Sequence, residues 1–323
     1  MKLYFLLAKV SCLAIGSHHA KAVCDYGQYL ERDSCVNCPS GTYNPFMGHT
    51  GFEDELLLPT SPMEKGRPTN VTLSRKSSTS RVMANLSIVA IYWGGREGTA
   101  FADEIDLWYQ KIGTSPWYAT LFEFNTPDQN ITEGSFWGYV DDNEAPLGEI
   151  SRKQINDRLQ FLINTGRVPY PTDDILYSFH FNPKANATGD GKSCGYHSYG
   201  VLKDGEKRYM YPIYYVIPDM QTLREMGTKC GQNDMVSTLS TLAHEVSEVV
   251  TDPYLDAWMD KDVAHEIADV CTENTYTIAH DGTRLIVQAI YSNKANACVS
   301  APFSQCYSCP PGTVSLEGSS SCL

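Results

Sequence analysis

The segment Ser240-Thr-Leu-Ala-His244-Glu245-Val-Ser-Glu248-Val-Val-Thr-Asp252-Pro253 decides the expected fold and chemistry. Positions i and i+4 stand on one face of a helix, about one turn apart, so His244 and Glu248 can hold one metal ion. Glu245 occupies the place where H-E-x-x-H metalloproteases keep their general base. Zinc binds carboxylate oxygen at nearly the same distance as imidazole nitrogen, which makes H-E-x-x-E chemically admissible. We predict a zinc-binding helix over residues 235–250.

A second polar cluster follows in His265-Glu266-Ile-Ala-Asp269-Val-Cys271. A catalytic zinc needs a third protein ligand and an open position for water. We predict Glu266 as this third ligand, because the intervening residues are enough for a turn and a second segment. Asp269 is then an acceptor for the free ring nitrogen of His244, or an alternative ligand. His265 is the competing nitrogen ligand.

The same residues have a reading without metal. The helix would bury an apolar face and leave its His and Glu side chains in solvent; that apolar face consists of Leu239, Leu242, Val246, Val249 and Val250. The second acidic cluster favours the metal. His197 could approach the metal or a substrate, but its expected role is structural. The acids Asp252, Asp256, Asp260 and Asp262 depart from the EF-hand spacing, so we expect a solvated loop there rather than a calcium site.

Hydrophobic patterns outline the rest of the body. Apolar runs predict strands, and 3.6-residue periodicity predicts helices, one of which ends before Gly166. The expected strands cover 88–93, 135–140, 175–181, 209–217 and 284–291, and the expected helices cover 99–112, 150–164 and 235–250. Because helices alternate with strands, we expect an α/β or α+β body, a zincin-like mixed sheet with packed helices.

Several features predict a secreted chain. Lys2, an apolar run and the small-x-small site Ala20-Lys21-Ala22 have the form of a signal peptide over residues 1–22. No later stretch is long and apolar enough to span a membrane. The net charge of −13 disfavours binding to nucleic acid or to anionic lipid. Glycosylation sequons begin at Asn70, Asn85, Asn130 and Asn186.

The two ends of the chain are rich in cysteine. Both contain C-x-x-C-P-x-G-T, at Cys35 to Cys38 and at Cys306 to Cys309. These ends resemble the short cysteine-rich modules of ephrin-receptor-like repeats. We expect disulfides there rather than a four-thiolate zinc site, because secretion exposes the chain to an oxidising compartment. The pairing we predict is Cys24–Cys35, Cys38–Cys306 and Cys309–Cys322, which would clasp the two ends into one small module.

The body resembles the EXORDIUM / phosphate-induced-protein family of extracellular glycoproteins. The matching pieces occur in the family's order over roughly residues 86–300: Val89-Ala-Ile-Tyr-Trp93-Gly, Ser115-Pro-Trp117-Tyr, Cys194-Gly-Tyr-His197-Ser-Tyr, Met235-Val-Ser with its H-E-x-x-E and Thr-Asp-Pro, and Glu266-Ile-Ala-Asp-Val-Cys271. The resemblance implies an extracellular or cell-wall location and a role in growth, and it supplies no reaction. The cysteine-rich ends depart from the plant pattern. For the remaining cysteines we predict Cys194–Cys230 and Cys271–Cys298.

These observations give the expected organisation. A signal peptide (1–22) precedes an N-terminal cysteine-rich segment (23–46), a linker (47–81), an EXORDIUM-like, zincin-like body (82–300) and a C-terminal cysteine-rich segment (301–323). The function expected is that of a secreted zinc-dependent hydrolase resembling a metallopeptidase. The alternative is a non-enzymatic growth or adhesion glycoprotein that binds extracellular or cell-wall components. A secreted effector acting on host material is a third reading, and nothing in the residues decides it.

Overall fold

The computed structural model describes two units of the chain separately. The first comprises residues 1–51 and 304–323, and the second comprises residues 52–303. The described residues are 28–31, 34–37, 40, 42–43, 71–144, 146, 148–183, 185–186, 193–204, 208–228, 230–231, 233–261, 265–272, 274–294, 296–300, 307–308 and 316–317.

The first unit contains strands from both ends of the chain. Strands β1 (Gln28–Glu31) and β2 (Ser34–Asn37) form an antiparallel pair. Strand β3 (Thr42–Tyr43) pairs with β19 (Tyr307–Ser308), so a segment near the N-terminus lies beside one near the C-terminus. The signal peptide and the three predicted terminal disulfides rest on residues or side chains outside those described.

The second unit is a mixed α/β body with a five-stranded sheet, ordered β10-β13-β8-β5-β6. The inner strands are parallel to one another, and β10 is an antiparallel edge strand. Central parallel strands are covered on both faces, which explains their almost continuous apolar sequences. The strands are β5 (Ser87–Trp93), β6 (Ser135–Asp142), β8 (Ile175–Phe181), β10 (Tyr196–Tyr199) and β13 (Ile213–Ile217).

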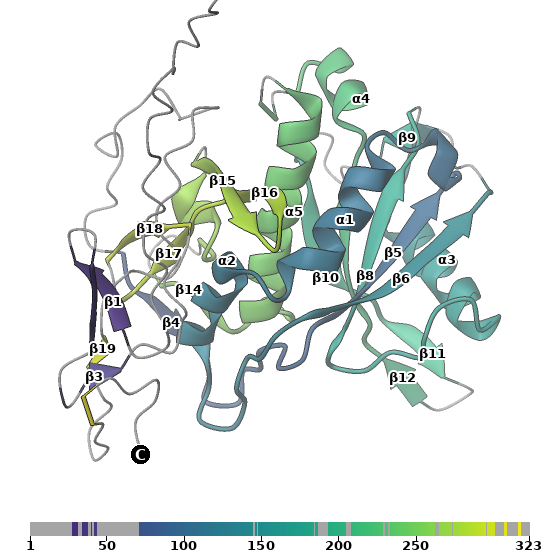
Figure 1. Cartoon of the computed structure of the whole chain (residues 1–323). Helices are drawn as coiled ribbons and strands as arrows, with labels where there is room; N and C mark the ends of the chain where they lie inside the picture. The colour runs from purple at the N-terminus through teal and green to yellow at the C-terminus, as the bar shows by residue number, and fades with distance from the viewer. Residues whose placement is uncertain are drawn as a thin grey trace, which may run out of the picture. The chain divides into compact units, whose positions relative to one another are not determined.

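Helices cover both faces of this sheet (Figure 1). Helices α1 (Ala102–Ile112) and α5 (Asp234–Thr251) pack in one core, and α3 (Arg152–Asn164) packs in the other. Successive side chains of a strand point to opposite faces. Ile213 and Tyr215 of β13 accordingly join the core of α5, while Tyr214 joins the core of α3.

Hairpins and short elements complete the body. Strand β16 packs against α5 and is part of the pair β15 (Thr275–His280) and β16 (Thr283–Gln288). The other antiparallel pairs are β17 (Ile290–Ser292) with β18 (Ala297–Val299), β4 (Leu73–Arg75) with β14 (Trp258–Asp260), and β11 (Leu202–Asp204) with β12 (Arg208–Met210). Shorter elements are η1 (Arg96–Gly98), α2 (Pro116–Ala119), η2 (Thr120–Phe124), β7 (Gly148–Glu149), β9 (Ala185–Asn186), α4 (Met220–Glu225) and η3 (Asp269–Cys271).

Two predicted elements are divided in the structure. The strand expected over 209–217 is split into β12 and β13, and Pro212 lies between them without an N–H for a ladder. The strand expected over 284–291 is split into β16 and β17 at Ala289. Residues 71–81, which the sequence placed in a linker, contribute β4 to the body, where Leu73 is buried. Among the described helices, none combines the length and apolar character that crossing a membrane requires.

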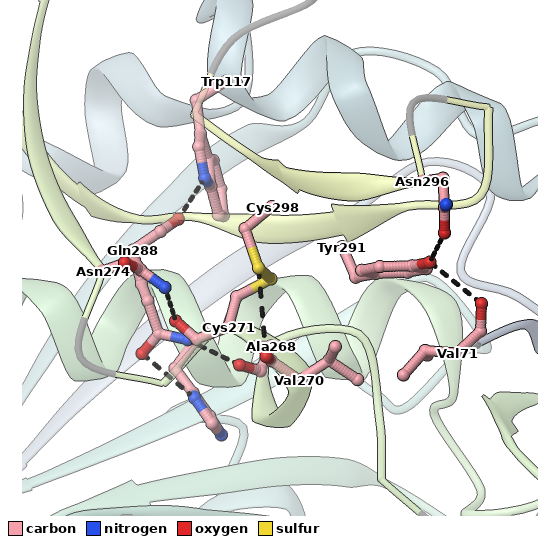
Figure 2. The surroundings of a disulfide bond; sticks show 11 residues. Val71, Trp117, Ala268, Val270, Cys271, Asn274, Gln288, Tyr291, Asn296 and Cys298 are labelled. Atoms are coloured by element: carbon pink, nitrogen blue, oxygen red, sulfur yellow. Dashed lines mark hydrogen bonds between the residues drawn. A yellow bond between two sulfur atoms is a disulfide. The ribbon is translucent and has the colours of Figure 1, made fainter. Parts of the chain in front are cut away.

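Two disulfides fix segments of the body. Cys194–Cys230 links the residues before β10 to those before α5. Cys271–Cys298 links the end of η3 to β18 (Figure 2). Both pairings agree with the prediction from the sequence. The disulfides are compatible with an extracellular location.

Candidate metal centre

Helix α5 presents its His and Glu side chains toward protein rather than toward water. The residues of the predicted apolar face are buried, but Glu245 and Glu248 are also only 3% exposed each. A solvated helix face would leave such carboxylates in water. The structure therefore contradicts the reading in which these acids are a solvent-exposed face, and the burial of two carboxylates on one helix requires partners.

The edge strand β10 supplies one of these partners. His197 stands opposite Tyr215 of β13 in the ladder. Its Nδ1 atom lies 3.3 Å from Glu245 Oε2 and 3.5 Å from Glu248 Oε2. Its Nε2 atom lies 3.5 Å from Glu266 Oε1. A histidine that sequence analysis assigned a structural role thus lies at the centre of the acidic cluster.

Glu266, which precedes η3, and Asp269, the first residue of η3, are the other acids of the site. Asp269 Oδ1 lies 3.6 Å from His244 Nε2, and Asp269 Oδ2 accepts a hydrogen bond from the backbone N–H of Glu266 at 3.2 Å. The neighbouring disulfide at Cys271 fixes the end of this segment. Both predicted acids are therefore at the site, Glu266 beside His197 and Asp269 beside His244. The side chain of His265 is exposed, and its carbonyl accepts a hydrogen bond from the N–H of Asp260.

The orientation of the His244 ring is set by Gln288, at the end of β16. Gln288 Nε2 donates to the carbonyl of Ala268 at 2.8 Å, which turns the amide oxygen toward the ring (Figure 2). That oxygen lies 3.2 Å from His244 Nδ1. Because an amide oxygen only accepts, Nδ1 carries a proton, and in the neutral ring that would bind a metal it is Nε2 that has the lone pair. Metal-binding histidines are held in the same manner by an acceptor on their second nitrogen.

The free Nε2 atom of His244 points at an oxygen without a hydrogen bond. Glu248 Oε1 lies 3.1 Å from it, yet it has no well-directed donor. His197 Nε2, Glu266 Oε1 and Asp252 Oδ2 are also buried without hydrogen-bond partners. Buried polar atoms are nearly always paired, so several unpaired ones at one place indicate a missing ligand.

The donor atoms form two overlapping groups that fit a metal ion. His197, Glu245 and Glu248 make one, and His244, Glu248 and Asp269 make the other; within each, all ligand atoms lie within 4.8 Å of one another. A tetrahedral zinc with ligands at about 2.1 Å places neighbouring donors about 3.4 Å apart. The distances of 3.1–3.6 Å from each ring to its carboxylates match this spacing.

The cluster carries an excess of negative charge, which its pKa values reveal. Burial, and then the charge of Glu248, raises the pKa of Glu266 to about 9. Burial opposes a charged ring at His244, but the negative charge of the Glu248 carboxylate raises its pKa to about 10. Burial likewise opposes ionisation of Glu248, yet His244 and His197 lower its pKa to about 2. Protons thus fill places that a cation would take, and metal binding would release them.

Burial and neighbouring charges also shift the pKa values of His197 and of the remaining acids. Burial opposes charge on His197, but hydrogen bonds to Glu245 and Glu248 raise its pKa well above the usual value. Burial raises the pKa of Glu245 and, together with the charge of Glu248, that of Asp269. Without a cation, the two imidazoles serve as the counter-charges of the carboxylates.

Two further residues shape the centre. Asp252 follows α5 and is fully buried, and its Oδ1 accepts from the N–H groups of Asp256 and Ala257, both at 2.6 Å. The expected solvated loop is therefore wrong at Asp252 and also at Asp260, which is 5% exposed. Gly195 lies so close to α5 that a Cβ atom there would be 2.7 Å from Thr241 Cγ2 and 3.0 Å from Glu245 Oε1. A residue without a side chain is needed for this approach.

Sequence reasoning missed Gln288 and gave His197 too little weight. Gln288 is an ordinary polar residue at the end of a strand, and no local pattern marks its contact with His244. His197 had one usable signal, since Cys194 precedes it closely and was paired in the prediction with Cys230, just before α5. That disulfide implies that His197 lies close to the helix.

Comparison with family models, with curated proteins and with solved structures finds no match.

Proposed function

We propose that the chain is a secreted metal-dependent hydrolase, with zinc held by His244, Glu248 and Asp269. The observation that carries the proposal is the fixed ring of His244, whose Nε2 atom faces the unpaired Oε1 atom of Glu248. Asp269 takes the place proposed for Glu266 in the sequence analysis, because Asp269 is the acid that lies near this nitrogen. Glu266 remains the alternative third ligand.

The exposure of these ligands supports a catalytic site. The side chain of Glu248 is 4% exposed, that of His244 is 18% exposed and that of Asp269 is 38% exposed. One side of the donor group is thus closed by protein, and the Asp269 side meets solvent. Structural zinc sites are closed, whereas catalytic sites keep a position for water or substrate.

In hydrolysis, the zinc ion and Glu245 would have separate roles. A bound zinc ion polarises a substrate carbonyl and lowers the pKa of water. Glu245 takes a proton from the attacking water, a role for which a buried carboxylate with a raised pKa is suited. His197 holds Glu245 at 3.3 Å, and Gly195 lets the carboxylate lie against β10. Two carboxylate ligands leave zinc less electron-deficient than histidines would, so we expect slow turnover.

The sheet edge supports a peptide as the substrate. Strand β10 carries His197 and ends the sheet, and its outer edge has no partner strand among the described residues. An extended peptide can add to such an edge through main-chain hydrogen bonds. A mixed sheet with an antiparallel edge strand beside an H-E-x-x-E helix also supports the zincin-like fold that we propose.

Secretion and the resemblance to the EXORDIUM family are part of the same proposal. The disulfides and the signal-like leader support secretion. Asn85 and Asn130 are exposed, as glycan attachment requires. The pairing of β3 with β19 supports a small terminal module. We keep the resemblance to the EXORDIUM family, with an extracellular or wall-associated setting, as part of this proposal.

Elemental analysis of the secreted protein, combined with a peptide-library hydrolysis assay, tests the function. We expect at least one equivalent of zinc in the wild type and hydrolysis that disappears on chelation. Glu245→Gln should keep an ion and lose hydrolysis by about 10²–10⁴-fold, whereas His244→Ala should lose the ion of the proposed site. A wild type without metal contradicts the proposal. A metal-loaded wild type without hydrolysis favours the non-enzymatic glycoprotein instead.

A further inference from the structure

We propose that Glu248 bridges two cations, the second of which is bound by His197 Nδ1, Glu245 Oε2 and Glu248 Oε2. This inference rests on the proposed function, since the first cation is the one at His244. It assigns the inner half of the cluster a metal site of its own. Glu245 would bind this ion through Oε2, so its Oε1 atom is the one left to take the proton of the attacking water.

The two oxygens of Glu248 face different imidazoles. Oε1 lies 3.1 Å from His244 Nε2, and Oε2 lies 3.5 Å from His197 Nδ1. Each ring therefore has its own oxygen of the same carboxylate. A carboxylate whose two oxygens face imidazoles on two different elements is suited to bridge two ions. In two-metal sites such ions lie about 3.5–4 Å apart.

The inner donors form a closed set. His197 Nδ1 lies 3.3 Å from Glu245 Oε2, close to the spacing of about 3.4 Å that tetrahedral zinc requires. The side chains of His197, Glu245 and Glu248 are each 4% exposed. The inner site thus has the enclosure of a structural metal site, in contrast to the outer site near Asp269.

His197 has an acceptor beyond its ring, as His244 has. Glu266 Oε1 lies 3.5 Å from His197 Nε2, and both atoms are buried without another partner. When Nε2 carries the proton and faces this carboxylate, Nδ1 presents its lone pair to Glu245 and Glu248. Glu266 would then orient His197 as Gln288 orients His244.

One divalent ion does not balance the formal charge of the cluster. The cluster contains five carboxylates, and no Lys or Arg of the described chain forms an ion pair with any of them. They belong to Glu245, Glu248, Asp252, Glu266 and Asp269. With all five carboxylates ionised and both imidazoles neutral, a second divalent ion leaves one formal negative charge, whereas a single ion leaves three. Buried charge of one sign is costly, which favours the second ion.

Metal stoichiometry and electron paramagnetic resonance of the full secreted chain test the bridge. We expect two equivalents of zinc after equilibrium dialysis and, after exchange to Mn²⁺, a spin-coupled spectrum. His197→Gln should bind one equivalent and give the spectrum of isolated Mn²⁺, while the matched control His265→Gln should bind two. The wild-type spectrum by itself tests the bridge, even where a variant fails to fold.

The outcomes separate this inference from the proposed function. One equivalent in the wild type that persists in His197→Gln and is lost in His244→Gln overturns the second site and leaves the proposed function standing. One equivalent that is lost in His197→Gln but persists in His244→Gln overturns the bridge and also the proposed function. Two equivalents with uncoupled spectra overturn the bridge by Glu248.

Discussion

Replacing Gln288 by Leu should weaken metal binding although Gln288 touches no metal. Leucine has a similar size but removes the acceptor at His244 Nδ1 and the donor to Ala268. The His244 ring then loses its fixed tautomer. Loss of such an orienting partner typically reduces metal affinity 10–100-fold, or about 1.4–2.7 kcal/mol.

The cost to folding should be smaller and separable. Gln288 is 6% exposed, so its two hydrogen bonds are worth about 1 kcal/mol each. The carbonyl of Ala268 keeps the N–H of Cys271 as a donor at 2.9 Å, which limits the penalty. We expect the free energy of unfolding of the metal-free protein to fall by about 1–2 kcal/mol.

Competition against a chromogenic chelator at fixed pH would measure the dissociation constant, and urea unfolding of the metal-free protein would measure stability. Gln288→Glu is the matched control, since it keeps an acceptor for His244 Nδ1 and loses the donor to Ala268. We expect Gln288→Glu to lose stability but keep affinity. The reasoning is refuted if Gln288→Leu binds zinc as tightly as the wild type, or if both variants lose affinity in proportion to stability.

Three further perturbations probe the body around the centre. Burial lowers the pKa of His180 from 6.5 to about 3, so the unfolded chain takes up its proton first and stability is lost as the pH falls through that window. About 2 kcal/mol should disappear between pH 7 and pH 5, and pH-dependent unfolding of His180→Gln should lack this part. Gly195→Ala should cost about 1–3 kcal/mol, because the new Cβ atom would overpack against Thr241 and then Glu245 of α5. Thermal unfolding measures this loss, and an unchanged midpoint would show that these side chains move aside without cost. Replacing Cys271 and Cys298 by Ser opens a loop with a sequence separation of 27 and should lower the free energy of unfolding by about 3.5 kcal/mol, measured with denaturant. No change would show that other contacts hold the loop.

Local patterns in the sequence predicted much of the fold. The continuous apolar runs at β5 and β8 and the periodicity of α3 and α5 are dictated by burial on the sheet, and these elements agree with the prediction within a few residues. The capping box of Ser151 and Gln154 starts α3, and Gly166, with φ of 67°, follows its end. The divided strands were missed because an apolar run conceals a break such as that at Pro212.

The site was predictable only where its geometry is local. The i, i+4 spacing placed His244 and Glu248 together because one helix fixes both residues. Their distant partners depend on how separate elements pack. His197 lies on a sheet edge and Gln288 at the end of a hairpin strand, and nothing in the sequence near α5 encodes either contact. The acidity of Glu266 and Asp269 indicated ligands, but their division between the two imidazoles required the tertiary structure.

The burial of the centre connects its chemistry to the stability of the fold. Helix α5 places two carboxylates beside the core that holds the sheet, where desolvation opposes their charge. Apolar side chains at these positions would stabilise the helix without a desolvation penalty, so folding alone does not explain the acids. Two imidazoles offset part of their charge in the metal-free protein, and their unpaired atoms show that the compensation is incomplete. A cation would replace the protons, pair the free oxygens and stabilise the native state by its binding energy. This incompletely compensated burial of charge is the feature that supports our proposal of a metal centre over a buried ion-pair network.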